Sequence, residues 1–141
     1  MQALYVPLTH ASASTINYFN GVSMNKRFNK DRVCLDCGEV KKLFDFPITS
    51  HKCRPCTNAK TAIHRAIKLN ALPKWVDSKQ IELIAGLYHL AYDITKQTGV
   101  THQVDHIVPL QGKIVSGLHT YCNLQVISAL DNVIKSNHFI N

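Results

Sequence analysis

Residues 105–137 read DHIVPLQGKIVSGLHTYCNLQVISALDNVIKSN, and this stretch decides the fold of the C-terminal part of the chain. A short run, His102-Gln103-Val104, leads directly into Asp105-His106. Asn123-Leu124-Gln125 follows after a segment that strand-breaking residues interrupt, namely Pro109, Gly112 and Gly117. The pattern predicts a strand that ends at His106, a loop, and a second strand with Asn123 in it or beside it.

The last part of this stretch, from Ser128 to Asn137, is typical of a short helix. Asp131 lies in its first turn and Lys135 near its end, so both charges complement the helix dipole. Asn132 then lies on the helix. The complete order predicted for the C-terminal part is strand, loop, strand, helix.

This spacing resembles the HNH nuclease motif, the ββα-metal fold of many phage, homing and colicin-type endonucleases. The family pattern begins with an Asp-His or His-His pair and continues with a central Asn-Leu. A His or Asn follows nine positions after the central Asn, and a Lys three positions after that. In this chain the matching residues are Asp105-His106, Asn123-Leu124, Asn132 and Lys135. Asn132 stands in place of the last His, a variant that is common in the family. The motif covers roughly the last quarter of the chain, and the segment from Leu72 to Val100 also resembles the lead-in of phage-type members.

The resemblance implies a role for each of these residues. A neutral His can take a proton from the attacking water, which makes His106 the expected general base. Asp105 and Asn132 are the expected ligands of a catalytic Mg²⁺ or Mn²⁺, which would keep open positions for phosphate oxygens. Asn123 is expected to hold the loop so that His106 points correctly. His119 is a further candidate for the catalytic group, with contact to phosphate or ion and a structural role both open.

Each of these residues has an ordinary alternative. An Asp-His pair is usually a turn or surface pair, and a single Asn is most often a turn residue or a solvated helix position. All the spacings occur together here, which favours the nuclease interpretation over coincidence.

Two CxxC pairs form the second strong pattern. Cys34-Leu35-Asp36-Cys37 and Cys53-Arg54-Pro55-Cys56 are separated by fifteen residues, which matches a closed tetrahedral site for structural Zn²⁺. Gly38 suits the tight turn after the first pair. Residues 42–46 are predicted to form a short strand with Phe44 and Phe46 on one face. These two rings provide too little apolar surface to form a stable core without a bound metal ion.

Other interpretations of the cysteines have less support from the sequence. Disulfides are the alternative for the four paired cysteines, and they are disfavoured in an intracellular chain. Cys122 is left over and is expected to be a free thiol in the core.

Two helices are predicted between the cysteine region and the HNH-like stretch. One runs from Thr57 to Leu69, before Leu72-Pro73. A longer one is capped by Asp77 or Ser78, continues to about Gln97 and stops at Gly99. Trp75 and Tyr92 are expected to be core or packing residues. His64, His89 and His102 have no partners in the sequence and are expected to be structural or surface residues.

The charge of the chain favours a polyanionic partner. Its 141 residues carry a formal net charge of +7. Double-stranded DNA is the expected partner, although solvated surface is the usual fate of a charge run. The expected DNA contacts are Lys26, Arg27, Lys41, Lys42, Lys52, Arg54 and Lys135.

The sequence predicts an intracellular protein, in the cytoplasm of a host cell if a phage encodes it. Residues 1–30 lack a basic-then-apolar signal pattern, and no apolar run is long enough to cross a bilayer. Secretion and membrane insertion are therefore not expected.

The predicted fold class is α+β, with four parts. These are a basic N-terminal arm (1–30), a four-cysteine zinc module (31–60), a helical connector (61–100) and an HNH nuclease core (101–141). The expected function is a divalent-metal-dependent DNA endonuclease of the homing type, encoded by a phage or mobile element, acting as a monomer or homodimer. The alternatives are a zinc-dependent DNA-binding protein with an inactive HNH core, and an RNA-directed protein whose zinc module binds single strands.

Overall fold

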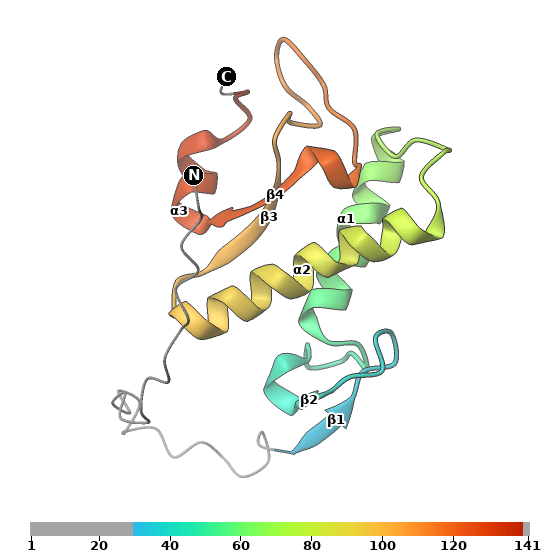
Figure 1. The fold of residues 1–141 in the computed structure, drawn as a ribbon, viewed down its shortest axis with the longest axis vertical. Coiled ribbons are helices and arrows are strands. Elements are labelled where there is room, and N and C mark those ends of the chain that lie inside the picture. Colours follow the sequence, from blue (N-terminus) through green and yellow to red (C-terminus); the bar gives the residue numbers. More distant parts are fainter. Residues whose placement is uncertain (1–29, 140–141) are drawn as a thin grey trace, which may run out of the picture.

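Three α-helices and two small antiparallel sheets succeed one another along residues 30–139, the part of the chain that the computed structural model describes. The predicted α+β class is confirmed. In Figure 1 the long helix α2 lies between the cysteine-containing end of the molecule and the β3–β4–α3 unit. The elements are β1 (Asp31–Val33), β2 (Val40–Lys42), the 3-10 turn η2 (Leu43–Asp45), α1 (Arg54–Lys68), α2 (Ser78–Thr98), β3 (His102–His106), the 3-10 turn η3 (Tyr121–Asn123), β4 (Leu124–Ser128) and α3 (Ala129–Lys135).

The strand predicted at residues 42–46 is wrong, because β2 ends at Lys42 and the 3-10 turn η2 occupies Leu43–Asp45. The Asp45 carboxylate accepts a hydrogen bond of 3.1 Å from the backbone N–H of Lys42, which closes the turn. Phe46 is therefore buried while Phe44 remains 40% exposed, so the two rings do not share a face. The turn at Gly38 has the expected left-handed backbone, with φ of 71°.

Helix α1 begins at Arg54, earlier than the predicted Thr57. Cys53 is its N-cap, and Pro55 in the first turn suits a position whose N–H has no helical partner. The second cysteine pair therefore opens a helix rather than forming a separate loop. The boundary expected at residue 60 falls inside α1, so the zinc module and the connector share this helix.

Helix α2 starts and stops where the sequence predicts. The Asp77 side chain accepts a 2.8 Å hydrogen bond from the backbone N–H of Gln80, and Gly99 ends the helix with φ of 73°. Ile84 and Ala91 are its buried residues. Among the described residues, no helix is both long and apolar enough to cross a membrane.

The C-terminal part has the predicted order of strand, loop, strand and helix. β3 and β4 pair antiparallel, with Asp105 opposite Gln125 and His106 opposite Leu124. The Ser128 hydroxyl caps α3 by accepting a 3.0 Å hydrogen bond from the N–H of Asp131. This order places His106 at the end of β3.

Two expected core residues are exposed instead. Trp75 is 61% exposed, and Cys122 is exposed in the η3 turn rather than packed in the core. Neither side chain belongs to a periodic helix face, so burial could not be inferred from spacing.

Candidate functional site

The four cysteines predicted to bind zinc form one cluster. Their sulfur atoms all lie within 4.8 Å of one another, and the Cys34–Cys56 and Cys37–Cys53 sulfurs are 3.9 Å apart. A tetrahedral zinc–thiolate site requires sulfurs about 3.8 Å apart, whereas a disulfide requires about 2.0 Å. No disulfide joins the four cysteines in the structure, and their sulfur spacing fits a structural zinc ion.

The cluster already stabilises one thiolate. Burial opposes ionisation of Cys34, but the backbone N–H groups around it lower its pKa to about 6. Two of these groups are the N–H of Asp36, at 3.4 Å, and the N–H of Cys53, at 3.3 Å. Burial raises the pKa of the Cys53 thiol to about 11. Four thiolates packed this closely need a cation to neutralise them.

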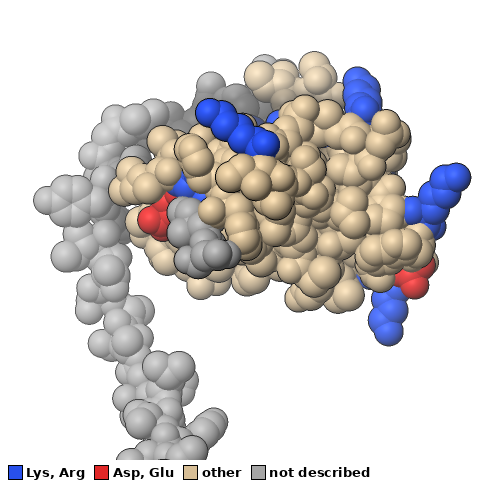
Figure 2. Space-filling view, turned by 90° about the horizontal axis from the view of Figure 1, so that it is seen from above, with Lys and Arg blue, Asp and Glu red and all other residues tan. Residues whose placement is uncertain are grey.

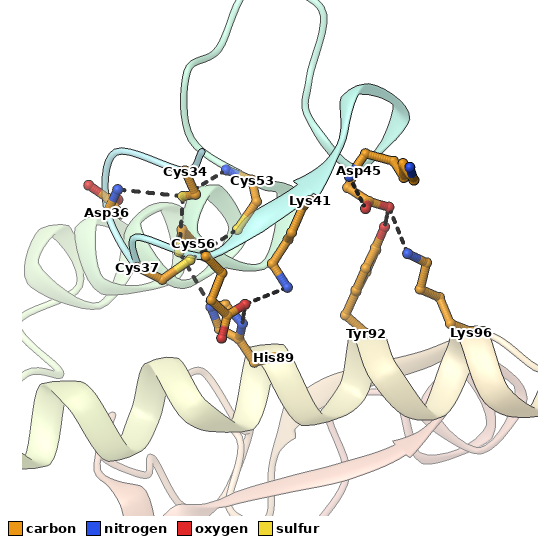
Figure 3. Close-up of polar contacts among 12 residues, drawn as sticks. Cys34, Asp36, Cys37, Lys41, Asp45, Cys53, Cys56, His89, Tyr92 and Lys96 are labelled. Atoms are coloured by element: carbon orange, nitrogen blue, oxygen red, sulfur yellow. Dashed lines mark hydrogen bonds and ion pairs between the residues drawn. The ribbon is translucent and has the colours of Figure 1, made fainter. Parts of the chain in front are cut away.

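One face of α2 holds the cysteine module in place (Figure 3). The His89 ring nitrogen Nε2 lies 3.4 Å from the sulfur of Cys56, although the sequence offered no partner for this residue. Tyr92 and Lys96 both bind the buried carboxylate of Asp45, Lys96 at 2.9 Å. These three α2 side chains recur at helical spacing, but their partners are distant in sequence.

A cavity of about 680 Å³ lies where α1, α2, β3 and the start of the loop after β3 meet. Asp105, His106 and Asn132, three of the predicted catalytic and metal-binding residues, all line it. The fold therefore brings to one cavity residues that are up to 27 positions apart in the sequence.

Asp105 and Asn132 each keep one oxygen for a ligand. Asp105 Oδ2 accepts from Lys135 Nζ at 2.9 Å and from Gln125 Nε2 at 3.2 Å, and Asn132 Nδ2 donates to Gln103 Oε1 at 2.7 Å. The second oxygen of Asp105 and the amide oxygen of Asn132 accept no hydrogen bond from the described residues. This pair offers only oxygen ligands and only one carboxylate, which suits a weakly held hard ion such as Mg²⁺.

His106 faces a second histidine. Its Nε2 lies 2.9 Å from Nδ1 of His119, whose ring is fully buried. The backbone N–H of His119 donates to the Ala71 carbonyl at 2.7 Å, which ties this ring to the α1–α2 connection. His119 does not line the cavity, and its Nε2 has no partner within residues 30–139. This position favours an orienting role for His119 over contact with phosphate or ion.

The environment of His106 keeps the ring neutral. Burial is the main cause of its lowered pKa, about 4, and the neighbouring His119 lowers it further. Nε2 of His106 contacts His119, whereas Nδ1 makes no hydrogen bond within residues 30–139. A neutral imidazole with one free nitrogen is the form that a general base requires.

Asn123 clamps the loop that follows His106. Its Oδ1 accepts from the N–H of Val108 at 2.8 Å, and its Nδ2 donates to the carbonyls of Val108 at 3.0 Å and Leu118 at 2.8 Å. One side chain therefore joins both ends of the loop.

The basic residues expected to bind DNA are mostly engaged within the protein. Lys41 pairs with Glu39 at 2.7 Å, Lys42 with Asp31 at 2.8 Å and Lys52 with Asp36 at 3.1 Å. Arg54 Nε donates to the Phe44 carbonyl at 3.3 Å. In Figure 2, Lys and Arg side chains stand singly around a mainly uncharged surface. Lys26 and Arg27 lie outside the described residues.

Lys135 has a different position from the other expected DNA contacts. It is buried, pairs with Asp105, and donates to the His106 carbonyl at 2.7 Å. Lys135 therefore fixes the end of β3 rather than offering its charge to solvent.

The chain has no significant match among protein-family models, curated proteins or solved structures. The assignment of a function therefore rests on the residues and their geometry.

Proposed function

We propose that the protein is a divalent-metal-dependent endonuclease of the HNH type that hydrolyses phosphodiester bonds in double-stranded DNA. The observation that carries the proposal is the meeting of Asp105, His106 and Asn132 at one cavity. The Asn123 clamp on the loop next to His106 supports it, because this clamp is the role that the HNH resemblance implies.

In this proposal, His106 takes the proton from the attacking water through Nδ1. His119 holds the opposite nitrogen, and Lys135 holds the His106 carbonyl, so the imidazole has one orientation in the cavity. Because the imidazole is already oriented, it does not have to turn before it accepts the proton.

The free oxygens of Asp105 and Asn132 would hold the divalent ion. When bound, such an ion supplies Lewis-acid stabilisation of the phosphate and of the leaving oxygen. The Lys135–Asp105 ion pair lowers the net negative charge at this pair of ligands, so we expect weak binding that needs millimolar Mg²⁺ or Mn²⁺.

The four-cysteine cluster has a structural role in the proposal. Its donor set is closed and soft, so it retains zinc while the oxygen-ligand site exchanges its ion. Zinc at the N-terminus of α1 would fix this helix, which forms part of the cavity lining.

The experiment is incubation of the purified protein with supercoiled plasmid and Mg²⁺ or Mn²⁺, followed by separation of supercoiled, open-circular and linear forms. Wild type should nick or linearise the plasmid only with added ion. His106→Ala should lower the rate by about 10²–10⁴-fold, because it removes the general base.

His64→Ala is the matched control, since His64 is an exposed histidine of α1 that does not line the cavity. It should cleave like the wild type. Cleavage by His106→Ala at the wild-type rate would contradict the proposal. DNA binding without cleavage by the wild type would favour a binding protein with an inactive core, and a preference for RNA would favour the RNA-directed alternative.

A further inference from the structure

The cavity has a wall that does not belong to the HNH-like stretch. Helix α1 contributes Asn58, Thr61 and Arg65 to the lining, alongside Asp105 and His106. The three α1 residues recur at intervals of three and four, so they lie along one face of the helix. A helix that starts in the cysteine module therefore presents polar groups to the candidate catalytic residues.

Arg65 is the one lysine or arginine among the described residues that line this cavity. Its side chain is exposed and makes no hydrogen bond or ion pair within the part of the chain that the structure covers. Lys41, Lys42 and Lys52, by contrast, are each paired with a carboxylate. A guanidinium held at a cavity without an internal partner remains available to an anion.

Arg65 lies on the same cavity as the candidate base. The lining includes Arg65 from α1 together with Asp105 and His106 from β3. A phosphodiester that enters the cavity can therefore contact both the guanidinium and the candidate catalytic residues.

We propose that Arg65 binds a phosphate of the nucleic-acid backbone in this cavity, so that the cysteine module contributes directly to the substrate site. A guanidinium donates two parallel N–H groups to the non-bridging oxygens of a phosphodiester. Asn58 and Thr61 extend the same polar face along α1. This inference rests on the proposed function, since it names a further substrate contact of the same site.

The cysteine cluster determines where this contact lies. Arg65 follows Cys56 by nine residues on one continuous helix, and Cys53 is the N-cap of that helix. An α-helix is a rigid spacer over this length, so a zinc ion on the cysteines sets the position of the guanidinium. The cysteine module then positions a substrate contact, whereas the sequence predicted a zinc module separate from the nuclease core.

The test uses full-length Arg65→Ala and Arg65→Lys, with Lys68→Ala as the matched control. Lys68 is an exposed cation on the same helix and does not line the cavity. Affinity for a fluorescein-labelled duplex DNA is measured in EDTA, without catalytic ion, over a range of salt concentrations. Circular dichroism and zinc content show that each variant is folded.

Arg65→Ala should reduce the log–log salt slope by about 0.9, the effect of one lost phosphate contact on duplex DNA. Arg65→Lys should keep the slope, because it keeps the charge. At saturating DNA and Mg²⁺, Arg65→Ala should cleave about 10²–10³-fold more slowly, as expected for loss of one stabilising donor, and Arg65→Lys should recover only part of the rate.

An unchanged slope in Arg65→Ala, or an equal loss in Lys68→Ala, would overturn the assignment of Arg65. A wild type that binds DNA but does not cleave it would overturn the nuclease function while the salt slope still tests Arg65. A wild type that cleaves, together with an Arg65→Ala variant that cleaves equally well, would overturn Arg65 alone.

Discussion

Asn123 and Asn132 have the same side chain but different surroundings. Asn123 uses both its amide oxygen and its amide nitrogen on the backbone of the loop. Asn132 uses only its nitrogen, on Gln103, and keeps its oxygen free of hydrogen bonds from the described residues. At the scale of single residues, Asn123 thus has a structural role, whereas Asn132 is a candidate metal ligand.

The two asparagines should respond differently to added metal. Asn132→Ala removes a proposed ligand of the divalent ion, so raising the Mg²⁺ concentration should recover part of its plasmid-nicking rate. Asn123→Ala leaves the ligands in place but releases the loop, so extra ion should not restore its rate. Titration of Mg²⁺ in nicking assays of both variants measures this difference, and equal rescue would contradict these roles.

Asp45 links the cysteine module to α2 through an ionised carboxylate. Burial alone would raise the pKa of Asp45, but hydrogen bonds from Tyr92 and Lys96 outweigh burial and lower it. A carboxyl whose pKa is lower in the folded state contributes stability above its unfolded pKa, about 3.9. This contribution is lost as the pH falls through the folded value.

Asp45→Asn should therefore lower the free energy of unfolding by about 1–3 kcal/mol at pH 7. The difference from wild type should begin to shrink below about pH 4, where the carboxyl of the unfolded chain takes up a proton, and should be lost as the pH falls through the lower pKa of the folded state. Asp93→Asn is the control, because Asp93 is an exposed α2 residue without an ion pair among residues 30–139. Urea unfolding of all three proteins at each pH measures the effect, and a difference that persists at low pH would contradict it.

At the scale of elements, the loop between β3 and η3 depends on a close approach of its backbone at Gly117. The Gly117 N–H donates to the Pro109 carbonyl at 2.8 Å. A Cβ at this position would lie 2.3 Å from the Val108 carbonyl oxygen and 2.6 Å from Asn123 Nδ2. The glycine therefore provides space for the Asn123 clamp, whereas the sequence alone suggested only a chain break.

Gly117→Ala should displace the clamp, lower the free energy of unfolding by about 1–3 kcal/mol and reduce cleavage. Gly86→Ala is a matched control, because Gly86 is an exposed position of α2 and a Cβ there meets no atom within 4 Å. This control should gain roughly 0.5–1 kcal/mol, since alanine favours a helix interior more than glycine does. Thermal unfolding and plasmid nicking measure both effects, and a Gly117→Ala protein as stable and active as wild type would contradict the clamp.

At the scale of the whole molecule, α1 and α2 connect the cysteine cluster to the cavity. α1 starts at the cluster and lines the cavity, and α2 contacts the cysteine module through His89, Tyr92 and Lys96 (Figures 1 and 3). Loss of zinc should therefore affect the cavity as well as the N-terminal sheet.

Cys34→Ser should lose zinc and, with it, plasmid nicking, because α1 is no longer fixed at its N-terminus. Cys122→Ser is the control, since Cys122 is an exposed thiol outside the cluster and should keep both zinc and activity. Zinc content, limited proteolysis and nicking are measured together. A zinc-free Cys34→Ser protein that nicks at the wild-type rate would show that the cysteine module is independent of the site.

The sequence by itself determined the features that depend on local chemistry. Cysteine spacing predicted the cluster, Asp77 and Gly99 predicted the limits of α2, and Asp131 and Lys135 predicted α3. Caps, turns and metal-ligand pairs depend on residues that are close together in the sequence, so they can be recognised from the sequence alone. The order of strand, loop, strand and helix followed from the same kind of signal.

Only the tertiary structure decided which residues meet across the chain. It buried His119 against His106, directed Lys135 to Asp105, and paired Lys42 and Lys52 of the cysteine module with Asp31 and Asp36. It also placed Arg65 on the cavity and His89 beside Cys56. The contact of His89 with Cys56 joins residues 33 positions apart and depends on how α1 and α2 pack, which no local pattern specifies. Long-range packing therefore decided which charged side chains have no partner within the described residues and can bind a ligand.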